Sequence, residues 1–464
     1  MHYTLPSVTT KTAVVALLTV SAVTVAVTAQ EQEQSQTSPY LAVSSPVWLA
    51  DFKGPLDNAR SSLTLDEDSI KVRPLDKVSN LNLGNYPPPM KAPPVDDPEV
   101  QAVIKQLDWS KVPDAPVRRA KNGDLNFTTY DTESDPHCWW SSTLCKKPKL
   151  DYIPEDVSYC PHAGDWGLNY DDGPYRVWSE DEDEKKYEEP RLYNFLIEQD
   201  KQKATLFFIG SNVMTFPEAA QRAFSDGHTI CSHTWSHPLM TTLSNEQIVS
   251  ELYFTQKAIK EVVGITPKCW RPPFGDIDDR VRAIAWLMGM RAILWDRDSN
   301  DWALAAQSIS AATVNGYFNE WVELRVADKD NEHGHIPLQH ESSNETIMLT
   351  EKWLPELKKH FNVVPIHQCI GDESPYWEDL SENQSAAAAD KHVAQAEKHD
   401  DSSQQQQEKQ DNSNSLPHNK IAIGSNKTLS KDHHQKLPTS AAPSFHAIDF
   451  TLLLSTIILF VVFA

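Results

Sequence analysis

The feature that most constrains the fold is a regular alternation of short apolar segments with amphipathic segments between about residues 156 and 370. Ala204–Gly210 reads ATLFFIG, which is typical of a buried strand. Residues 244–264 repeat apolar side chains at helical spacing between a serine and a glycine, the residues preferred at the two ends of a helix. Strands that alternate with helices favour parallel strands joined by crossover helices. We therefore predict one barrel-sized α/β domain over residues 156–371.

The same alternation predicts the individual elements. Helices are expected at 98–107, 217–227, 244–264, 278–290, 308–323 and 350–361. Strands are expected at 204–210, 228–233, 268–275 (ending in a turn), 291–302 (with its exit loop), 335–340 and 362–370.

The composition changes on both sides of this domain. Residues 30–155 are rich in proline, and the run NYPPPMKAPPVDDP at 85–98 excludes helix and central strand because proline lacks the backbone donor. This region is compatible with a propeptide, a spacer arm or loops packed on the next domain. Residues 372–440 are polar and lack the apolar content needed to fold, so we interpret them as a disordered stalk.

The two ends of the chain have the pattern of targeting signals. Lys11 precedes an apolar run that ends in small residues before Gln30, which is typical of a secretory signal peptide over residues 1–29. A transmembrane anchor is the alternative. The apolar C-terminus follows small residues and a short spacer, which is typical of a GPI attachment signal at 441–464, with Ser440 as the attachment residue. A C-terminal tail anchor is the alternative.

Charge, cysteines and sequons fit a secretory route. The formal charge of −23 disfavours nucleic acid and anionic lipid as partners, since both need a positive surface, so membrane contact is expected only through a GPI anchor. An even count of six cysteines suits a secreted protein with disulfides. Four sequons mark candidate glycosylation sites at Asn126, Asn344, Asn383 and Asn426.

Polar clusters follow the predicted strands at the points where the strands end. Taken singly, each has an ordinary interpretation as a turn, a rigid corner or a surface loop. Functional side chains of α/β barrels gather where strands run into their following loops, so five clusters in series indicate one site. The clusters are NYDDGP with Asp171 and Asp172, SHTWSH with His233 and His237, WRPPFG with Arg271, DRDSNDW with Asp298, Asp301 and Trp302, and PLQH with His340.

The residue types in these clusters complement one another chemically. Two histidines with one carboxylate form a common ligand set for catalytic zinc. One of two adjacent aspartates can bind the metal while the other stays free as a base, since neighbouring strand residues point to opposite faces. An arginine can keep that base ionised, and a histidine held by a carboxylate is a standard general acid.

In this order, the five clusters resemble the five motifs of the polysaccharide deacetylase domain of carbohydrate esterase family four, most closely those of fungal chitin deacetylases. The resemblance covers about residues 156–371 and implies a distorted (β/α) barrel with an irregular N-terminal extension. It implies that Asp171 is the catalytic base. It also implies that Asp172, His233 and His237 bind Zn²⁺, or another divalent ion such as Co²⁺.

The same resemblance implies roles for the remaining site residues. Arg271 would orient Asp171, and the backbone amide of Phe274 would help to hold the oxyanion. Asp301 would tune His340 as the general acid. Asp298, Trp302 and Leu338 would contact the substrate, with Trp302 lining the pocket and Leu338 shaping the part that takes the acetyl methyl group.

The chain departs from the family pattern at two places. Asn169-Tyr170 stands where the family often has Thr-Phe, and Phe274 stands where it often has tyrosine. If the backbone amide of Phe274 stabilises the oxyanion, the missing tyrosine hydroxyl should have little effect on this stabilisation. The acidic segment 179–189 is typical of a solvated loop. The alternative is a loop whose negative charge favours partly deacetylated, cationic substrates.

The resemblance also bears on the cysteines. It implies a disulfide between Cys160 and Cys369 that ties the two ends of the domain together. Cys138 and Cys145 could close a small loop. Cys231 and Cys269, each two residues before a motif, are compatible with either a disulfide or two buried thiols.

The resemblance implies a zinc-dependent hydrolase that removes N-acetyl groups from chitin, giving chitosan and acetate. It would be a GPI-anchored enzyme on the extracellular face of a fungal cell membrane and in the cell wall. One alternative is an acetyl esterase acting on O-acetylated glycans such as xylan. The other is a wall protein that binds glycan without turning it over, although such a protein needs neither a base nor an acid nor a metal. No oligomeric state is predicted.

Overall fold

The computed structural model describes residues 46–50, 70–72, 75, 78, 81–121, 123–175 and 190–378. Several predictions concern residues outside this part of the chain. They are the signal peptide, the acidic segment 179–189, the sequons at Asn383 and Asn426, the stalk beyond residue 378 and the GPI signal with Ser440.

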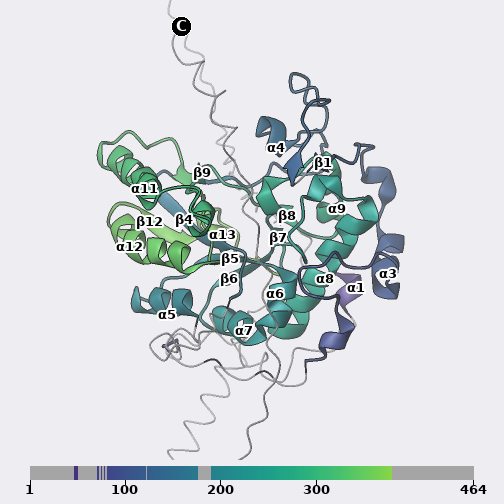
Figure 1. Cartoon of the computed structure of the whole chain (residues 1–464), viewed down its shortest axis with the longest axis horizontal. Coiled ribbons are helices and arrows are strands. Elements are labelled where there is room, and N and C mark those ends of the chain that lie inside the picture. Colours follow the sequence, from purple (N-terminus) through teal and green to yellow (C-terminus); the bar gives the residue numbers. More distant parts are fainter. Residues whose placement is uncertain are drawn as a thin grey trace, which may run out of the picture. The chain divides into compact units, whose positions relative to one another are not determined.

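A curled, largely parallel sheet forms the centre of the described structure (Figure 1). Its strands run in the order β3-β10-β4-β5-β6-β7-β8, and β12 pairs with β4. Only β3 pairs antiparallel to its neighbour among these strands. The bounds are β3 (Tyr159–Cys160), β4 (Asp165–Asp171), β5 (Thr205–Phe208), β6 (Thr229–Ser232), β7 (Cys269–Trp270), β8 (Arg291–Ala292), β10 (Gly334–His335) and β12 (Asn362–Pro365).

A further pair of short strands brings a distant segment to the carboxyl end of β4. β9 (Arg297–Asp298) and β11 (Pro337–Leu338) pair in parallel. The Asp171 amide donates to the Gln339 carbonyl over 2.9 Å, and the Glu341 amide donates to the Asp171 carbonyl over 3.1 Å. The sheet therefore curls as the prediction of a distorted barrel requires. The predicted strands at 291–302 and 335–340 are each split into two short pieces.

Helices flank the strands on both sides in Figure 1, with α5, α11 and α12 on one side and α8 and α9 on the other. α8 has the predicted ends, because Ser244 forms a capping box with Gln247 and Gly264 closes the helix at φ 91°. The bounds are α5 (Arg191–Glu198), α6 (Gly210–Thr215), α7 (Pro217–Ser225), α8 (Asn245–Val263), α9 (Asp279–Leu287), α10 (Trp302–Ala305), α11 (Ala311–Val326), α12 (Asn344–His360) and α13 (Ile366–Cys369).

Several predicted boundaries are wrong, including both ends of α11, which spans Ala311–Val326 rather than residues 308–323. The strand expected over 204–210 ends at Phe208, and the chain continues into α6. α12 starts at Asn344 rather than at residue 350, because Ser343 provides the helix cap. The strand expected over 362–370 stops at Pro365 and is followed by α13. Local apolar character did not separate a strand from the short helix that follows it.

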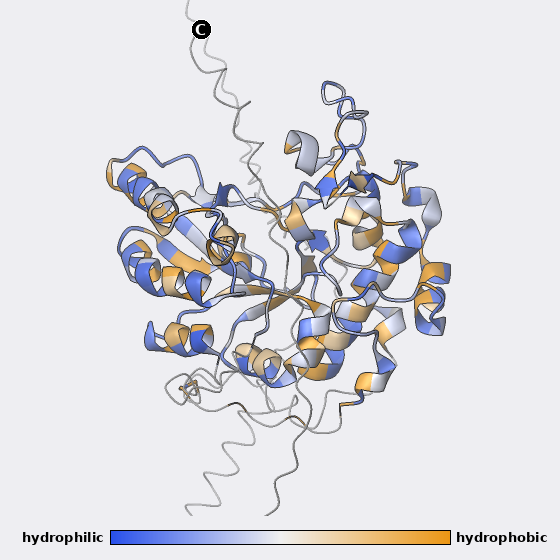
Figure 2. Ribbon diagram, in the orientation of Figure 1, coloured by the Kyte–Doolittle hydropathy of each residue, from blue (hydrophilic) through white to orange (hydrophobic). Residues whose placement is uncertain are grey.

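The core lies between the sheet and the helices, and Figure 2 shows hydrophobic residues on the central strands. Its large, fully buried side chains include Trp166, Tyr170, Trp235, Trp270 and Phe254. Full burial of a large apolar side chain contributes about 1.5–3 kcal/mol. These residues make the framework rigid around the strand ends, where the predicted site lies.

Segments on both sides of the predicted domain also pack onto it. α3 (Pro98–Gln106), which was predicted, lies against α8, and its Val100 and Val103 are fully buried. Short elements accompany it at α1 (Val47–Ala50), α4 (Trp140–Thr143), β1 (Ala120–Lys121) and β2 (Asp124–Leu125). At the other end, the Tyr376 hydroxyl accepts a hydrogen bond from the Ile230 amide. The folded part therefore extends beyond the predicted boundary at residue 371.

All six cysteines are paired in three disulfides. Cys160 is bonded to Cys369, Cys138 to Cys145 and Cys231 to Cys269. The last pair, which the sequence left open, joins neighbouring strands, since Cys231 lies in β6 and Cys269 in β7.

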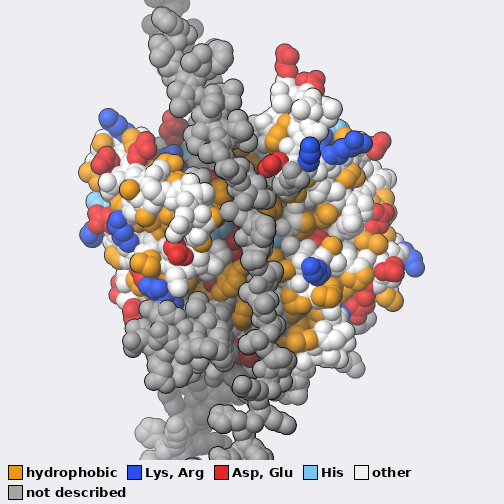
Figure 3. Space-filling model, in the orientation of Figure 1, with side chains coloured by type: hydrophobic (Ala, Val, Ile, Leu, Met, Phe, Trp, Pro, Cys, Tyr) orange, Lys and Arg blue, Asp and Glu red, His pale blue; other side chains and the backbone are white. Residues whose placement is uncertain are grey.

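The described surface is mixed in character. On the face drawn in Figure 3, acidic and basic side chains are interspersed over the part of the chain that the structure describes. No helix within that part is both long and apolar enough to cross a membrane. Two sequon residues, Asn126 and Asn344, are exposed.

Candidate active site

The predicted site residues come from the ends of five strands. Asp171 is the last residue of β4 and Asp172 follows it, while His233 follows β6 and Arg271 follows β7. Asp301 and His340 come shortly after β9 and β11, respectively. Because the carboxyl ends of these strands meet at one edge of the curled sheet, the side chains converge from distant parts of the sequence.

Asp172, His233 and His237 form a compact group. Asp172 Oδ1 lies 3.6 Å from His233 Nε2 and 3.3 Å from His237 Nε2. Ligand atoms bound to one tetrahedral zinc ion at about 2.1 Å would lie roughly 3.4 Å apart. Asp172 Oδ1 is also buried and makes no hydrogen bond. This spacing and this unsatisfied oxygen fit a divalent metal ion.

Hydrogen bonds orient the two histidines for this task. His233 Nδ1 lies 2.8 Å from the Arg271 carbonyl oxygen, which can only accept, so Nδ1 carries the proton and Nε2 presents a lone pair. The loop between the histidines is held by the buried Glu251 of α8. Glu251 Oε2 accepts from the amides of Trp235 (2.9 Å) and Ser236 (2.8 Å).

The charge of Asp172 suits metal binding. Burial acts to raise the pKa of its carboxyl, but His237 and His233 outweigh burial and hold the pKa well below its usual range. Asp172 is therefore an anion at neutral pH, and an anionic oxygen is a strong ligand for a divalent cation.

The neighbouring Asp171 is held by a buried arginine. Its Oδ1 accepts from Arg271 Nη1 over 2.7 Å, and its Oδ2 lies 3.9 Å from His233 Nε2. Arg271 is fully buried and also donates to Asn169 Oδ1 (2.6 Å) and to the Leu294 carbonyl (3.0 Å). Arg271 thus fixes one carboxylate oxygen of Asp171, and the other oxygen lies toward His233.

His340 and Asp301 form the second ionic pair of the site. His340 Nδ1 lies 2.7 Å from Asp301 Oδ1, and the His340 amide donates to Asp301 Oδ2 over 2.9 Å. Burial acts to lower the pKa of His340, but the Asp301 carboxylate outweighs it and raises the pKa to about 10. His340 is therefore protonated at neutral pH and can act as an acid.

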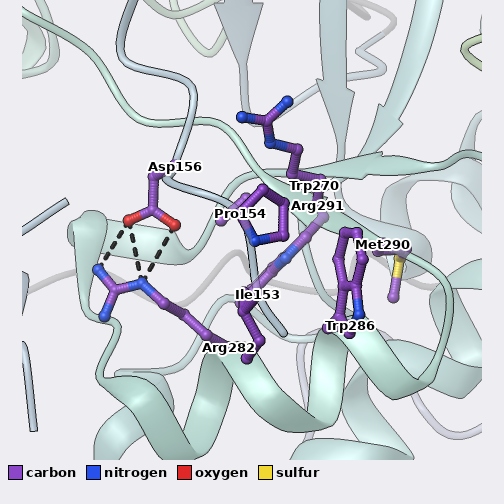
Figure 4. Close-up of a pocket in the computed structure, with 9 residues that line it drawn as sticks. Ile153, Pro154, Asp156, Trp270, Arg282, Trp286, Met290 and Arg291 are labelled. Carbon is purple, nitrogen blue, oxygen red and sulfur yellow. Dashed lines mark hydrogen bonds and ion pairs between the residues drawn. The ribbon is translucent and has the colours of Figure 1, made fainter. Parts of the chain in front are cut away.

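The other predicted residues differ in their exposure. The Phe274 side chain is 60% exposed, and its ring meets the His237 ring edge-on at 4.7 Å between centroids. Trp302 is 52% exposed at the start of α10, and Leu338 is buried in β11. Asp298 is exposed and accepts from the Asn300 amide over 2.8 Å. None of these residues lines the small pocket shown in Figure 4.

Strained backbone gathers around the same strand ends. Positive φ angles, which side-chain-bearing residues seldom adopt, occur at Asp172 (75°), Thr234 (66°), His237 (59°), Phe274 (58°) and Asn300 (56°). Such conformations persist only where the surrounding structure enforces them, and they cluster at functional sites.

Sequence reasoning missed two residues that shape the site. Glu251 holds the loop between the two histidines by accepting hydrogen bonds from its amides. The only signal in the sequence is the position of this charged residue on the apolar face of a predicted helix, three residues after Ile248. Asn169 was noted only as a departure from a family pattern. In the structure it is fully buried, holds Arg271 through Oδ1 and donates from Nδ2 to the Pro337 carbonyl over 2.9 Å.

Residues 158–293 match the protein family described as polysaccharide deacetylase. Over these residues the chain is similar to polysaccharide deacetylases. The matched stretch contains the first three polar clusters, up to Arg271 and Phe274, and ends before Asp301 and His340.

Curated relatives agree with this assignment. The chain is 41% identical over 283 residues to a chitin deacetylase of Amylomyces rouxii, across 61% of this chain and 64% of that protein. It is 39% identical over 290 residues to chitin deacetylase 2 of Cryptococcus neoformans var. grubii, across 61% of each chain. The chain thus spans less than two thirds of the length of these relatives.

Among solved structures, the chitin deacetylase from the fungal pathogen Colletotrichum lindemuthianum matches with 26% identity and a TM-score of 0.41. That match covers 48% of this chain and 96% of the other.

Proposed function

We propose that this protein is a zinc-dependent chitin deacetylase, which hydrolyses the N-acetyl groups of chitin to give chitosan and acetate. The observation that carries the proposal is the arrangement of Asp171 beside the group formed by Asp172, His233 and His237. A carboxylate fixed on one oxygen by Arg271 stands next to a two-histidine, one-carboxylate ligand set whose Asp172 oxygen has no other partner. The names of the relatives support the choice of substrate.

Asp172 Oδ1, His233 Nε2 and His237 Nε2 would hold the zinc ion. A zinc ion bound there would supply a Lewis acid that polarises the acetamide carbonyl and lowers the pKa of the attacking water. The ligand types and spacing fit zinc, and they also admit another divalent ion such as cobalt.

The residues of this chain then supply the proton transfers. Asp171 takes a proton from the attacking water through its Oδ2, while Arg271 holds Oδ1 by a hydrogen bond and so orients the carboxylate. The backbone amide of Phe274 donates a hydrogen bond to the negative charge that develops on the carbonyl oxygen. His340, which Asp301 keeps protonated, gives its proton to the departing sugar amine. An amine leaves far more readily once it is protonated.

The exposed residues around the site suit a polysaccharide. Trp302 offers an exposed aromatic ring that can stack on a sugar, and Asp298 offers a carboxylate that can accept from its hydroxyl groups. Leu338 is buried beside the site and suits the methyl group of the acetamide. An extended polysaccharide can reach Trp302 and Asp298 because both side chains are exposed.

The proposed location is the extracellular face of a fungal cell membrane and the cell wall. The signal-peptide pattern at residues 1–29 and the GPI pattern ending at Ala464, with attachment at Ser440, support it. Three disulfides suit an oxidising compartment. The exposed sequons Asn126 and Asn344 suit the same route.

The proposal is tested by acetate release from chitin oligosaccharides, with acetylated xylan as the competing substrate. Asp171→Asn should lower acetate release by about 10²- to 10⁴-fold while the zinc content stays unchanged, because only the base is lost. Asp165→Asn is the matched control, since Asp165 starts the same strand β4 and Asp171 ends it, and this variant should keep full activity. Retained activity in Asp171→Asn, or a preference for xylan, would contradict the proposal.

A further inference from the structure

A small disulfide loop, residues 138–145, lies against the active-site segments although it precedes the matched residues 158–293. Arg282 of α9 holds both ends of this loop. Its Nη1 donates to the Cys138 carbonyl over 2.6 Å and its Nη2 donates to the Cys145 carbonyl over 2.9 Å. The same guanidinium pairs with Asp156, as the dashed lines in Figure 4 show. The buried Arg282 side chain thus binds the loop to α9 through hydrogen bonds to both of its ends.

The buried carboxylate of Asp276 joins the disulfide loop to two other segments. Its Oδ1 accepts from Trp139 Nε1 and from Ser141 Oγ, each over 2.9 Å. Its Oδ2 accepts from the Thr241 amide over 2.9 Å, and the Thr241 hydroxyl lies within 2.9 Å of both oxygens. Asp276 has no exposed surface, so its charge depends on these donors.

Each of the joined segments continues directly into the active site. Asp276 comes two residues after Phe274, and Thr241 comes four residues after His237. The Trp140 ring covers Gly275, because a Cβ built there would lie 2.3 Å from it. Any larger residue at 275 would push Trp140 away. The loop therefore leaves the backbone around Phe274 little room to shift.

From these contacts we propose that the disulfide loop is a positioning element of the active site. It acts through Asp276, which sets the distance between the segment carrying Phe274 and the segment carrying His237. Trp139 and Ser141 are positioning residues that touch neither substrate nor metal. The disulfide loop, which belongs to the proline-rich region 30–155, consequently stays on the working enzyme. The kinetic part of this inference rests on the proposed deacetylase activity, whereas the part about metal binding rests only on the proposed zinc site.

The experiment compares Trp139→Phe and Ser141→Ala with the wild-type chain. Each change removes one donor to Asp276, and Ser141→Ala leaves the packing almost intact. We expect kcat on chitin oligosaccharides to fall about three- to tenfold with little change in KM, because the reacting groups shift while the substrate rim remains. Zinc affinity, measured by competition with a chelator, should fall about tenfold.

Ser134→Ala is the matched control, since it removes a serine–aspartate hydrogen bond, from Ser134 Oγ to Asp131, that involves neither Trp139 nor Asp276. It should leave the melting temperature, kcat and zinc affinity close to wild-type values. Combined with Trp139→Phe, Thr241→Val should give less than the sum of the single effects on zinc affinity, because both act through Asp276.

Wild-type zinc affinity and kcat in both Trp139→Phe and Ser141→Ala would overturn the inference. So would a loss of kcat in Ser134→Ala equal to that in Ser141→Ala. If the wild-type chain releases no acetate, the proposed function fails, and the zinc affinities still decide whether the disulfide loop positions the site.

Discussion

Two histidine–carboxylate clusters in this protein have similar composition but differ in geometry. In the first, Asp172 Oδ1 lies 3.3 and 3.6 Å from the histidine nitrogens and makes no hydrogen bond. In the second, His335 lies between two carboxylates, with Nδ1 2.6 Å from Asp296 Oδ2 and Nε2 2.8 Å from Asp330 Oδ1. His333 completes this second group.

The difference distinguishes the proposed metal site from a cluster whose polar atoms pair with one another. Both nitrogens of His335 have a carboxylate partner at hydrogen-bond distance, and Arg297 Nη2 lies 3.5 Å from Asp330. That cluster is satisfied by its own members and ties β10 to two neighbouring loops. In the Asp172 group, Asp172 Oδ1 has no hydrogen-bond partner. His233 directs Nδ1 to the Arg271 carbonyl, which leaves Nε2 to face Asp172. Residue types alone do not separate the two clusters.

The largest expected effect comes from the first cluster. His237→Ala should reduce acetate release at least about 10³-fold, since it removes one ligand of the proposed zinc site. Its effect on unfolding should be small, because the His237 side chain is only partly buried. Acetate assays and thermal melts on the same preparation check both statements. Activity above a tenth of wild type would show that His237 does not hold the metal.

The second cluster should respond in the opposite way. His335→Ala leaves Asp296 and Asp330 without their shared partner. Breaking a fully buried pair costs about 3–5 kcal/mol, and we expect a smaller loss here because both carboxylates are partly exposed. Denaturant unfolding should show this loss, whereas the folded fraction should keep its acetate release. A His335→Ala protein that is stable but inactive would contradict the separation of the two clusters.

A smaller effect is expected from the acid pair, and it depends on pH. Because Asp301 raises the pKa of His340 to about 10, the stabilising charge interaction is present below the unfolded-state pKa and is lost as the pH rises through about 10. Asp301→Asn should move the alkaline limb of kcat to lower pH. At pH 8 this should cost roughly 30-fold if the pKa of His340 returns to about 6.5. An unchanged alkaline limb would exclude His340 as the acid.

The sequence predicted those parts of the molecule that depend on local signals. Serine and glycine at the ends of α8 predicted both of its boundaries, because caps act within one turn. The polar residues that follow β4, β6 and β7 could be predicted as one site, because the carboxyl ends of parallel strands lie at the same edge of a sheet.

Other features depend on contacts between distant residues and left no local signal. Asp276 meets Trp139 across 137 positions, and Arg282 meets Cys138 across 144. α13 follows β12 with no turn of polar residues between them, so the predicted strand extends too far along the chain. Whether Cys231 bonds to Cys269 depends on the register of the neighbouring strands β6 and β7, which spacing along the chain does not determine.

The metal content of matched variants tests the central claim most directly. After dialysis against zinc and removal of the excess, elemental analysis should find one zinc per chain in the wild type and in the folded fraction of His335→Ala. Asp172→Ala should contain essentially none, because it lacks the oxygen that faces both histidines. Zinc retained at full occupancy in Asp172→Ala, or lost in His335→Ala, would contradict the assignment of Asp172, His233 and His237 as the metal site.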